Sequence, residues 1–339
     1  MTWHSVGRLA DNGPAENLCL PMVRARPEVD GNEKDTWKVV YRTVTAPVDK
    51  LIPQRLDRLD SYLGTRESAV DPIRPNCEKK IIWYGGRKQK TDDAIVYIHG
   101  FSASRMETWP LCDQLAARMG ANLFYTRLNG HGQSGLAMGK AQVENWLDDG
   151  LEAVTIGSRI GHRIILIGTS TGGTLATWLA AHRTTAPRIH RLILLSPNFF
   201  PKNPIAAAAL WPPAMRLYEK VFGAWRSVAV TNPMQARYWT AKYPIKAIAT
   251  MMKLVRLAWQ ADLRQSKMPV LMLVNPWDPV INVTLALLRF RRFPSRRKKV
   301  VFFRGYKDLG RHVLAGEILS GQTTGQALTI IGDFLSRNA

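Results

Sequence analysis

Ile164-Ile-Leu-Ile-Gly168-Thr169-Ser170-Thr171-Gly172-Gly173 decides the fold, because it predicts a buried strand, a sharp turn and the start of a helix in immediate succession. A serine on such a turn has strained backbone angles, and Cβ atoms two positions to either side would collide. The turn lifts the hydroxyl clear of the sheet and directs the helix N-terminus at charge that develops in a reaction. We therefore expect Ser170 to be a nucleophile. The alternative is a serine in a structural Gly-rich turn.

Short apolar runs alternate with longer helical patterns from residue 94 onward. Parallel strands that are buried on both faces produce runs of this kind. The repetition predicts an α/β fold with a mostly parallel central sheet and helices on both faces. The expected strands are Ala94–Ile98, Asn122–Tyr125, Arg163–Ile167, Arg191–Leu195, Val270–Val274 and Lys299–Phe303, and two earlier runs, Trp37–Val44 and Lys80–Tyr84, are typical of edge strands.

One connection in this series is too long for a single crossover helix. About 70 residues separate Ser196 from Met268, and we expect them to form a helical cap over the C-terminal edge of the sheet. The first residues are rich in Pro, Gly, Asn and charge, which favours a loose tail. The predicted organisation is a tail over residues 1–35, a core of residues 36–198 and 268–339, and a cap insertion over residues 199–267.

Four motifs follow one another along the chain: His99-Gly100-Phe101, Gly130-His131-Gly132, Gly168-Thr-Ser170-Thr-Gly172, and the segments that contain Asp278 and His312. In this order they resemble the α/β-hydrolase superfamily, and most of all its carboxylesterase, monoacylglycerol lipase and lysophospholipase-like members. The resemblance covers roughly residues 90–338 and implies the α/β-hydrolase fold. The family's usual aspartate before the GHG is missing, because Arg127-Leu-Asn-Gly130 stands there, and this departure affects a structural loop. Residues 1–90 match nothing in the family.

The position of each histidine selects a general base. Active sites of open parallel sheets lie at the C-terminal ends of the strands. His99 and His131 follow strands but lie in Gly-flanked turns, where the usual role is to shape the backbone. His312 follows the last strand in a loop that can reach over the sheet, and it completes the chain order Ser, Asp, His of this fold. The remaining histidines are in the tail or at the opposite edge: His4, His162, His182 and His190.

The acid that orients this base should also follow a strand. Asp278 lies in the turn after Val270–Val274, whereas Leu195-Ser-Pro-Asn198, the other position that some family members use, offers no carboxylate. Asp308 is near His312 in sequence, but that spacing does not guarantee contact. The alternative role for Asp278 is an ordinary Asx turn beside Pro279.

These roles predict a reaction. His312 takes the proton of Ser170, which attacks an ester carbonyl and forms an acyl-enzyme, while Asp278 holds the imidazole tautomer; water then releases the acid. The oxyanion needs two backbone N–H donors, which we assign to Thr171 and, from the family resemblance, to Phe101. The reaction requires no metal and no organic cofactor.

The charge of the chain is unusual. Lys and Arg total 47 against 26 Asp and Glu, which gives a net charge of +21. Such a field attracts polyanions, although a generally basic proteome or a solubility effect would explain it equally well. In residues 199–267 the basic residues face only Glu219 and Asp262, and aromatic residues and methionines are abundant. An apolar lining suits an acyl chain and a basic rim suits an anionic membrane, but the aromatics could simply pack the cap on the sheet.

We therefore expect a serine hydrolase that cleaves carboxylic esters with lipid-like or medium-chain acyl groups. The alternatives are an aminopeptidase-type serine peptidase, which would need a cap carboxylate for the free amino group, an acyltransferase, and a non-catalytic binding protein, which should have lost a triad member. Nucleic-acid binding is disfavoured because no known binding motif is present. The N-terminus lacks the apolar run of a signal peptide, and no apolar run reaches membrane-spanning length. We expect a cytoplasmic protein with peripheral contact to anionic membrane, and the sequence indicates no oligomeric state.

Overall fold

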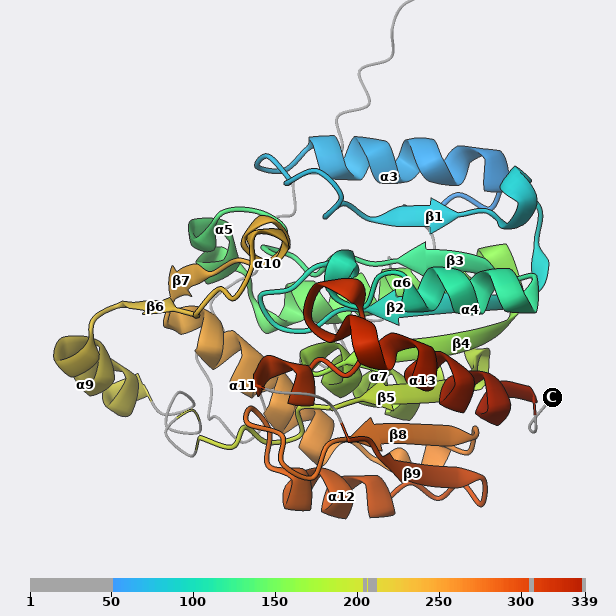
Figure 1. Cartoon of the computed structure of the whole chain (residues 1–339). Helices are drawn as coiled ribbons and strands as arrows, with labels where there is room; N and C mark the ends of the chain where they lie inside the picture. Colours follow the sequence, from blue (N-terminus) through green and yellow to red (C-terminus); the bar gives the residue numbers. More distant parts are fainter. Residues whose placement is uncertain (1–50, 204–205, 207–211, 305–307, 337–339) are drawn as a thin grey trace, which may run out of the picture.

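The computed structural model describes the chain except for residues 1–50, 204–205, 207–211, 305–307 and 337–339 (Figure 1). The expected tail over residues 1–35 and the expected strand Trp37–Val44 therefore lie outside the described residues. The strands are β1 (Lys80–Ile82), β2 (Thr91–Ile98), β3 (Asn122–Tyr125), β4 (Gly161–Thr169), β5 (Ile189–Leu195), β6 (Trp225–Ser227), β7 (Lys242–Pro244), β8 (Val270–Val274) and β9 (Lys298–Phe302).

Helices connect these strands. The α-helices are α3 (Leu59–Ser68), α4 (Leu111–Met119), α5 (Gly135–Lys140), α6 (Val143–Ile160), α7 (Thr171–Ala181), α9 (Pro212–Phe222), α10 (Pro233–Tyr238), α11 (Lys246–Gln260), α12 (Val283–Arg291) and α13 (Glu317–Ser336). The short 3₁₀ helices are η1 (Leu56–Arg58), η2 (Tyr84–Gly86), η3 (Arg105–Glu107), η4 (Ala186–Arg188), η5 (Leu263–Gln265) and η6 (Asp308–Arg311). None of the described helices is long and apolar enough to cross a membrane.

The central sheet has the order β1-β3-β2-β4-β5-β8-β9. All neighbouring pairs are parallel except β1 and β3, which are antiparallel. The predicted mostly parallel sheet is therefore confirmed, and β1, which begins at the predicted Lys80, lies at an edge as expected. A small antiparallel pair of β6 and β7 forms outside this sheet.

The inner strands of the sheet are buried, whereas the last strand, β9, is partly exposed. Every residue of β3 and β8 is buried, and so are the C-terminal residues of β2, β4 and β5. The expectation of burial on both faces is wrong for β9, where Lys298 and Lys299 are exposed and Phe302 is 56% exposed. The reason is that β9 is the other edge strand, with one hydrogen-bonded neighbour in the sheet.

Two apolar layers hold helices to the faces of the sheet. On one face, Trp146 of α6 and Trp178 of α7 belong to a buried cluster that also contains Met252 of α11. On the other face, Leu115 of α4 and Leu328 of α13 pack in a second cluster. The sheet is thus covered on both faces, as Figure 1 shows, and its strands hold the connecting loops at fixed positions.

The segment between β5 and β8 begins at the edge of the sheet where β2 and β8 have their C-terminal ends, marked by their arrowheads in Figure 1. It contains α9, β6, α10, β7 and α11. Helix α11 packs against α7, and its Met251 and Met252 are buried, so these two side chains join the helix to the core. Among the aromatic residues of this segment, Trp211, Tyr218 and Phe222 have side chains outside the described set. The cap boundaries stay a prediction.

Residues 51–90 are tied to the core by buried charges. Lys79 is 7% exposed and its ammonium forms ion pairs with Asp149, at 2.8 Å, and with Glu152. The Tyr62 hydroxyl of α3 donates to the same Glu152 at 2.8 Å. Buried charges in proteins are normally paired, since an unpaired one is very costly. The segment thus supplies polar partners to α6, whose Asp149 also accepts from the Asn129 backbone N–H.

Candidate active site

Three loops from distant parts of the chain bring Ser170, Asp278 and His312 together. Ser170 lies between β4 and α7, Asp278 follows β8, and His312 follows η6. His312 Nδ1 is 2.8 Å from Asp278 Oδ2, and His312 Nε2 is 2.9 Å from Ser170 Oγ. All three side chains are buried, with 5%, 1% and 7% of the surface of Ser170, Asp278 and His312 exposed. A hydroxyl, an imidazole and a carboxylate in one hydrogen-bonded series can activate the hydroxyl as a nucleophile.

The backbone of Ser170 is strained as the sequence pattern predicts. Its φ is 51° and its ψ is −116°, a conformation that costs a non-glycine residue free energy. A Cβ on Gly172 would lie 2.0 Å from the Ile98 carbonyl oxygen, and one on Gly168 would lie 2.5 Å from the Gly172 carbonyl oxygen. Both glycines are therefore required by close backbone contacts. The turn holds the serine at the N-terminus of α7.

Asp278 combines the two roles that the sequence left open. Its Oδ1 accepts hydrogen bonds from the backbone N–H groups of Val280 and Ile281, at 2.7 and 3.1 Å. Its Oδ2 faces His312. The Asx-type turn and the contact with His312 are thus one arrangement, in which the turn orients the carboxylate.

The histidines of the two Gly-flanked turns are buried and hold backbone groups. His99 Nε2 accepts from the Leu128 N–H at 3.1 Å, so its Nδ1 carries the proton that it donates to the Gly100 carbonyl at 2.8 Å. Burial lowers the pKa of His99 to about 4, and burial also lowers the pKa of His131 well below its ordinary value. Both imidazoles therefore stay neutral near pH 7, as backbone-shaping groups should.

The loop after β2 contains Phe101, one of the two expected oxyanion donors. The Gly100 carbonyl accepts from His99 and from the Ala103 N–H, at 2.8 and 3.3 Å. In a trans peptide the N–H points away from the carbonyl, so these bonds also set the direction of the Phe101 N–H. A Cβ on Gly100 would lie 3.3 Å from Ser170 Cβ, which shows that the loop passes beside Ser170. The other expected donor, Thr171, is the first residue of α7.

The unusual Arg127 has its partner in the segment that the sequence could not place. Its guanidinium contacts both oxygens of Glu67 in α3, with a closest distance of 2.8 Å, and it also donates to the His131 carbonyl and to Gln133. Arg127 is 3% exposed. The predicted consequence, a change confined to a structural loop, agrees with this arrangement, because the pair supports the turn from Leu128 to Gln133.

A family model described as serine aminopeptidase, S33, matches residues 89–317. The chain belongs to this S33 family of α/β-hydrolases. The match spans β2, the turn of Ser170, the Asp278 loop and the His312 loop. No curated protein matches the chain by sequence.

Solved structures agree with this S33-family fold. A chain described with the metagenome-derived lipolytic enzymes LipS and LipT superposes with a TM-score of 0.65 at 18% identity, covering 78% of this chain and 100% of the other. A soluble variant of the monoglyceride lipase from Saccharomyces cerevisiae gives 0.59 at 13% identity, with 79% and 96% covered. The monoacylglycerol lipase of Paleococcus ferrophilus gives 0.56 at 16%, with 77% and 98% covered. At these identities the likeness establishes the fold.

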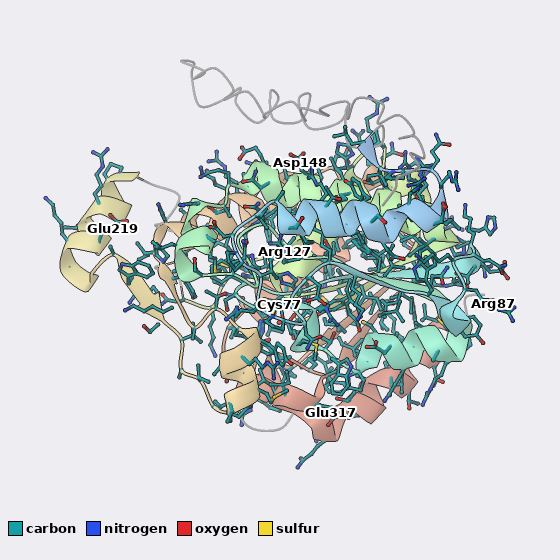
Figure 2. All side chains as sticks on the ribbon, turned by 90° about the horizontal axis from the view of Figure 1, so that it is seen from above. Cys77, Arg87, Arg127, Asp148, Glu219 and Glu317 are labelled. Carbon is teal, nitrogen blue, oxygen red and sulfur yellow. The ribbon has the colours of Figure 1, made fainter. Side chains whose placement is uncertain are left out.

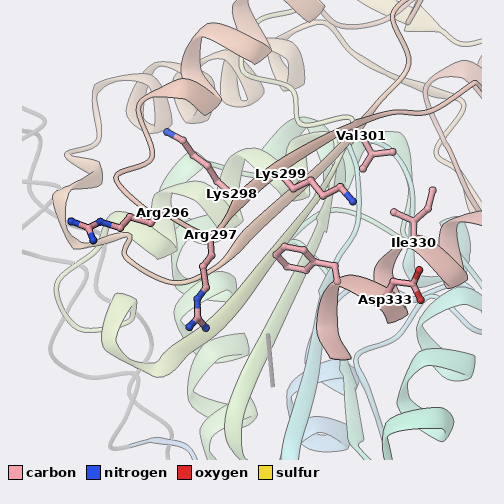
Figure 3. Close-up of a pocket in the computed structure, with 8 residues that line it drawn as sticks. Arg296, Arg297, Lys298, Lys299, Val301, Ile330 and Asp333 are labelled. Atoms are coloured by element: carbon pink, nitrogen blue, oxygen red, sulfur yellow. The ribbon is translucent and has the colours of Figure 1, made fainter. Parts of the chain in front are cut away.

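A basic pocket of the S33-family chain lies away from Ser170, Asp278 and His312. It has a volume of about 380 Å³, and Figure 3 shows its lining, which comes from β9, the residues just before it and α13: Arg296, Arg297, Lys298, Lys299, Val301, Ile330, Asp333 and Phe334. These basic residues precede or begin β9, whereas His312 follows its end. The basic cluster from Arg289 to Lys299 is predicted from the sequence to be a solvated helix end. This agrees with Arg291 and Arg292, which are exposed, but it is wrong for Arg289. Arg289 is 2% exposed and donates to the carbonyls of Ala258 and Ala261.

Sequence reasoning missed one group beside the site. Glu107 of η3 is 3% exposed, and its Oε2 accepts from the Gly100 N–H at 2.7 Å. A glutamate in a loop is normally exposed, so its residue type alone gave no sign of burial. The described residues contain no group of three or more His, Cys, Asp or Glu side chains that could hold a metal ion.

Proposed function

We propose that this protein is a serine hydrolase that cleaves carboxylic esters through an acyl-enzyme. The observation that carries the proposal is the position of His312, within hydrogen-bond distance of both Ser170 Oγ and Asp278 Oδ2. That geometry is required of a general base between a nucleophile and an orienting acid. The strained turn of Ser170 gives independent support, since strain of this kind is typical of functional residues.

In the proposed reaction, Ser170 Oγ attacks the ester carbonyl while its proton passes to His312 Nε2. Asp278 holds the proton on Nδ1 and stabilises the imidazolium. The backbone N–H groups of Phe101 and Thr171 would donate to the oxyanion. The proton then moves from His312 to the leaving alcohol, and a water molecule, activated by the same base, releases the acyl group.

The substrate that we propose is a lipid-like or medium-chain acyl ester. Phe101 packs edge-on against Tyr243 of the cap, with ring centroids 5.2 Å apart, and against Trp146, at 6.2 Å. The residue that would supply an oxyanion donor is thus itself in an aromatic cluster. Apolar surface beside the reacting atoms favours an acyl chain over a polar substituent. The lipolytic enzymes and monoacylglycerol lipases among the structural relatives support the same substrate class.

The aminopeptidase alternative has the family description in its favour but finds little support in the cap. Of the two carboxylates in residues 199–267, Glu219 projects from α9, at the outer end of the molecule in Figure 2. Asp262 is paired with Arg264 at 2.6 Å and faces a pocket lined by Ala181 and Arg183 at the far end of α7. A free α-amino group needs a carboxylate at the active site, and neither of these two lies beside Ser170. The carboxylate that does lie there, Glu107, already accepts from the Gly100 N–H and the Tyr97 hydroxyl.

The test is covalent labelling followed by a substrate panel. A fluorophosphonate probe should label the wild type once and should leave Ser170→Ala unlabelled, while His312→Ala should lose ester hydrolysis and keep the melting temperature of the wild type. Acyl esters of graded length are then compared with aminoacyl amides. Labelling that persists in Ser170→Ala would refute the assigned nucleophile, and faster turnover of the amides would establish the peptidase instead.

A further inference from the structure

A second carboxylate lies beside the three proposed catalytic residues. Glu107 is buried, and its Oε2 is 2.7 Å from the Gly100 nitrogen and 2.9 Å from the Tyr97 hydroxyl. A Cβ built on Gly100 would lie 2.7 Å from Glu107 Oε1 and 3.3 Å from Ser170 Cβ, so the carboxylate and the nucleophile approach Gly100 together. The charge of Glu107 therefore acts at the reaction centre in a medium that screens it weakly.

The contacts of Glu107 hold the two loops on which catalysis depends. Its carboxylate accepts the N–H of the His99–Gly100 peptide, and the next peptide carries the proposed oxyanion donor of Phe101. Its carbonyl oxygen is close to Gly316, whose φ is 120°, since a Cβ there would lie 2.2 Å away. Gly316 follows His312 by four residues. The backbone and side chain of Glu107 thus connect the oxyanion loop to the loop of the proposed base.

Among the residues that the structure describes, few other titratable groups face this carboxylate. Tyr97 reaches it from β2 and His312 interacts with it electrostatically. On its own helix, Arg105 turns away to Asn76 and Glu78. Helices α4 and α13 pack nearby with two further groups: Cys112, whose thiol pKa burial raises, and Glu317, whose carboxylate lies near Gly321. Burial raises the pKa of Glu107 itself to about 7, and the Gly100 N–H, Tyr97 and His312 lower it from what burial alone would give.

We propose that Glu107 is a positioning residue of the hydrolytic reaction: its carboxylate fixes the Gly100–Phe101 loop and stabilises the positive charge that forms on His312. This inference rests on the proposed function. Glu107 takes no proton in the step, because the proton of Ser170 goes to His312 Nε2 as the Oγ–carbon bond forms. The carboxylate acts through its charge and its hydrogen bond to Gly100. Two carboxylates, Asp278 and Glu107, would then stabilise one imidazolium.

The variant Glu107→Gln tests the charge while it keeps the shape and the acceptor for the Gly100 N–H. At about pH 8.5 we expect kcat for a p-nitrophenyl butyrate assay to fall about tenfold, with KM within about twofold of wild type. The acidic limb of the kcat/KM profile should move to lower pH, because the amide cannot take up the proton that the buried Glu107 carboxylate binds below about pH 7. Glu107→Leu, which also removes the acceptor, should lower kcat about 100-fold.

The melting temperature distinguishes this role from a purely structural one. Replacement of a purely structural residue would lower Tm, whereas we expect Glu107→Gln to raise it. Between the ordinary carboxyl pKa and about 7 the folded state keeps a proton that the unfolded state has lost, so the buried carboxylate destabilises the fold as pH rises through this window. Glu107→Gln should therefore raise Tm relative to wild type at about pH 8.5 and leave it nearly unchanged at about pH 4.5. The matched control is Glu152→Gln, another buried glutamate, which is paired with Lys79 and should lower Tm without moving the pH profile.

The outcomes separate this inference from the proposed function. Wild type that takes up the fluorophosphonate probe and hydrolyses the ester, together with a slower and more stable Glu107→Gln, supports the inference. The inference is overturned if the probe labels wild type but Glu107→Gln keeps its kcat and its acidic limb, or behaves like Glu152→Gln. If wild type neither takes up the probe nor hydrolyses the ester, the proposed function fails and the inference fails with it.

Discussion

Replacement of Asp278 by asparagine should lower kcat/KM, and the structure sets an upper and a lower limit on this decrease. Asp278 Oδ1 accepts two backbone N–H groups, of Val280 and Ile281, whereas Oδ2 faces His312 Nδ1. An asparagine oxygen that keeps both backbone bonds leaves its NH₂ group facing Nδ1. His312 must then accept at Nδ1 and carry its proton on Nε2, toward Ser170, so it cannot remove the serine proton. This wrong tautomer lowers kcat by about 10⁴-fold in triads of this kind.

The amide could instead turn its oxygen toward His312 and restore the correct tautomer. Its NH₂ group would then face the N–H groups of Val280 and Ile281, and two buried donors would lose their acceptor. Each unsatisfied group costs about 1–3 kcal/mol, so the flipped form lies about 2–6 kcal/mol higher. At about 1.36 kcal/mol for each factor of ten, even the cheaper flip leaves an active fraction of about one in thirty. We expect kcat/KM to fall between about 30-fold and 10⁴-fold.

The assay is ester hydrolysis near neutral pH, with thermal unfolding measured on the same preparations. The matched control is Asp93→Asn, which makes the same chemical change at a buried carboxylate near the opposite end of the sheet, where Asp93 pairs with Arg163 at 2.8 Å. That variant should keep its kcat. A rate for Asp278→Asn within about threefold of wild type would refute the tautomer argument and with it the role of Asp278.

Three further predictions follow from buried charge, the cap and the net charge. Glu67→Gln should lower the free energy of unfolding by about 3–5 kcal/mol in urea titrations, because it leaves the Arg127 charge buried without its partner. The exposed-pair control Asp57→Asn should leave the urea midpoint nearly unchanged, and a Glu67→Gln midpoint equal to that of wild type would contradict the argument. In an ester series, kcat/KM should climb a few-fold per added carbon, since a buried methylene contributes about 0.8 kcal/mol, and a preference for acetate would refute an acyl pocket. Anionic vesicles should bind the +21 chain at low salt and release it as the Debye length shortens from ~30 to ~8 Å, whereas binding that ignores salt would exclude an electrostatic origin.

Much of the fold could be predicted because its signals are local. A strand buried on both faces needs a continuous apolar run, so β3 and β8 have the predicted bounds, Asn122–Tyr125 and Val270–Val274. Edge strands lack this requirement, because one side has no neighbour and water reaches part of the strand. That is why the prediction of two buried faces failed for β9.

In the candidate site, too, the local features could be predicted from the sequence, whereas the contacts between distant segments could not. The turn at Ser170 is encoded within five residues, since Gly168 and Gly172 are needed wherever this backbone bends so sharply. The histidine and the aspartate could be selected by their position after strands, because parallel strands end at one edge. Asp278 and His312 are 34 residues apart in the sequence, yet Asp278 Oδ2 lies 2.8 Å from His312 Nδ1. This contact depends on how β8 and β9 pair and on the loops that follow them.

By itself, then, the sequence determined the α/β architecture, the nucleophile turn and the candidates for acid and base, because each depends on periodicity, on glycine at close backbone contacts or on position after a strand. Tertiary structure alone decided which buried charges meet. Glu67 and Arg127 are 60 residues apart, and Glu107 accepts the Gly100 N–H from η3, in a part of the chain whose sequence shows no sign of burial. A charged side chain has no periodic signature of burial, since burial becomes tolerable only when a partner from elsewhere in the chain arrives beside it.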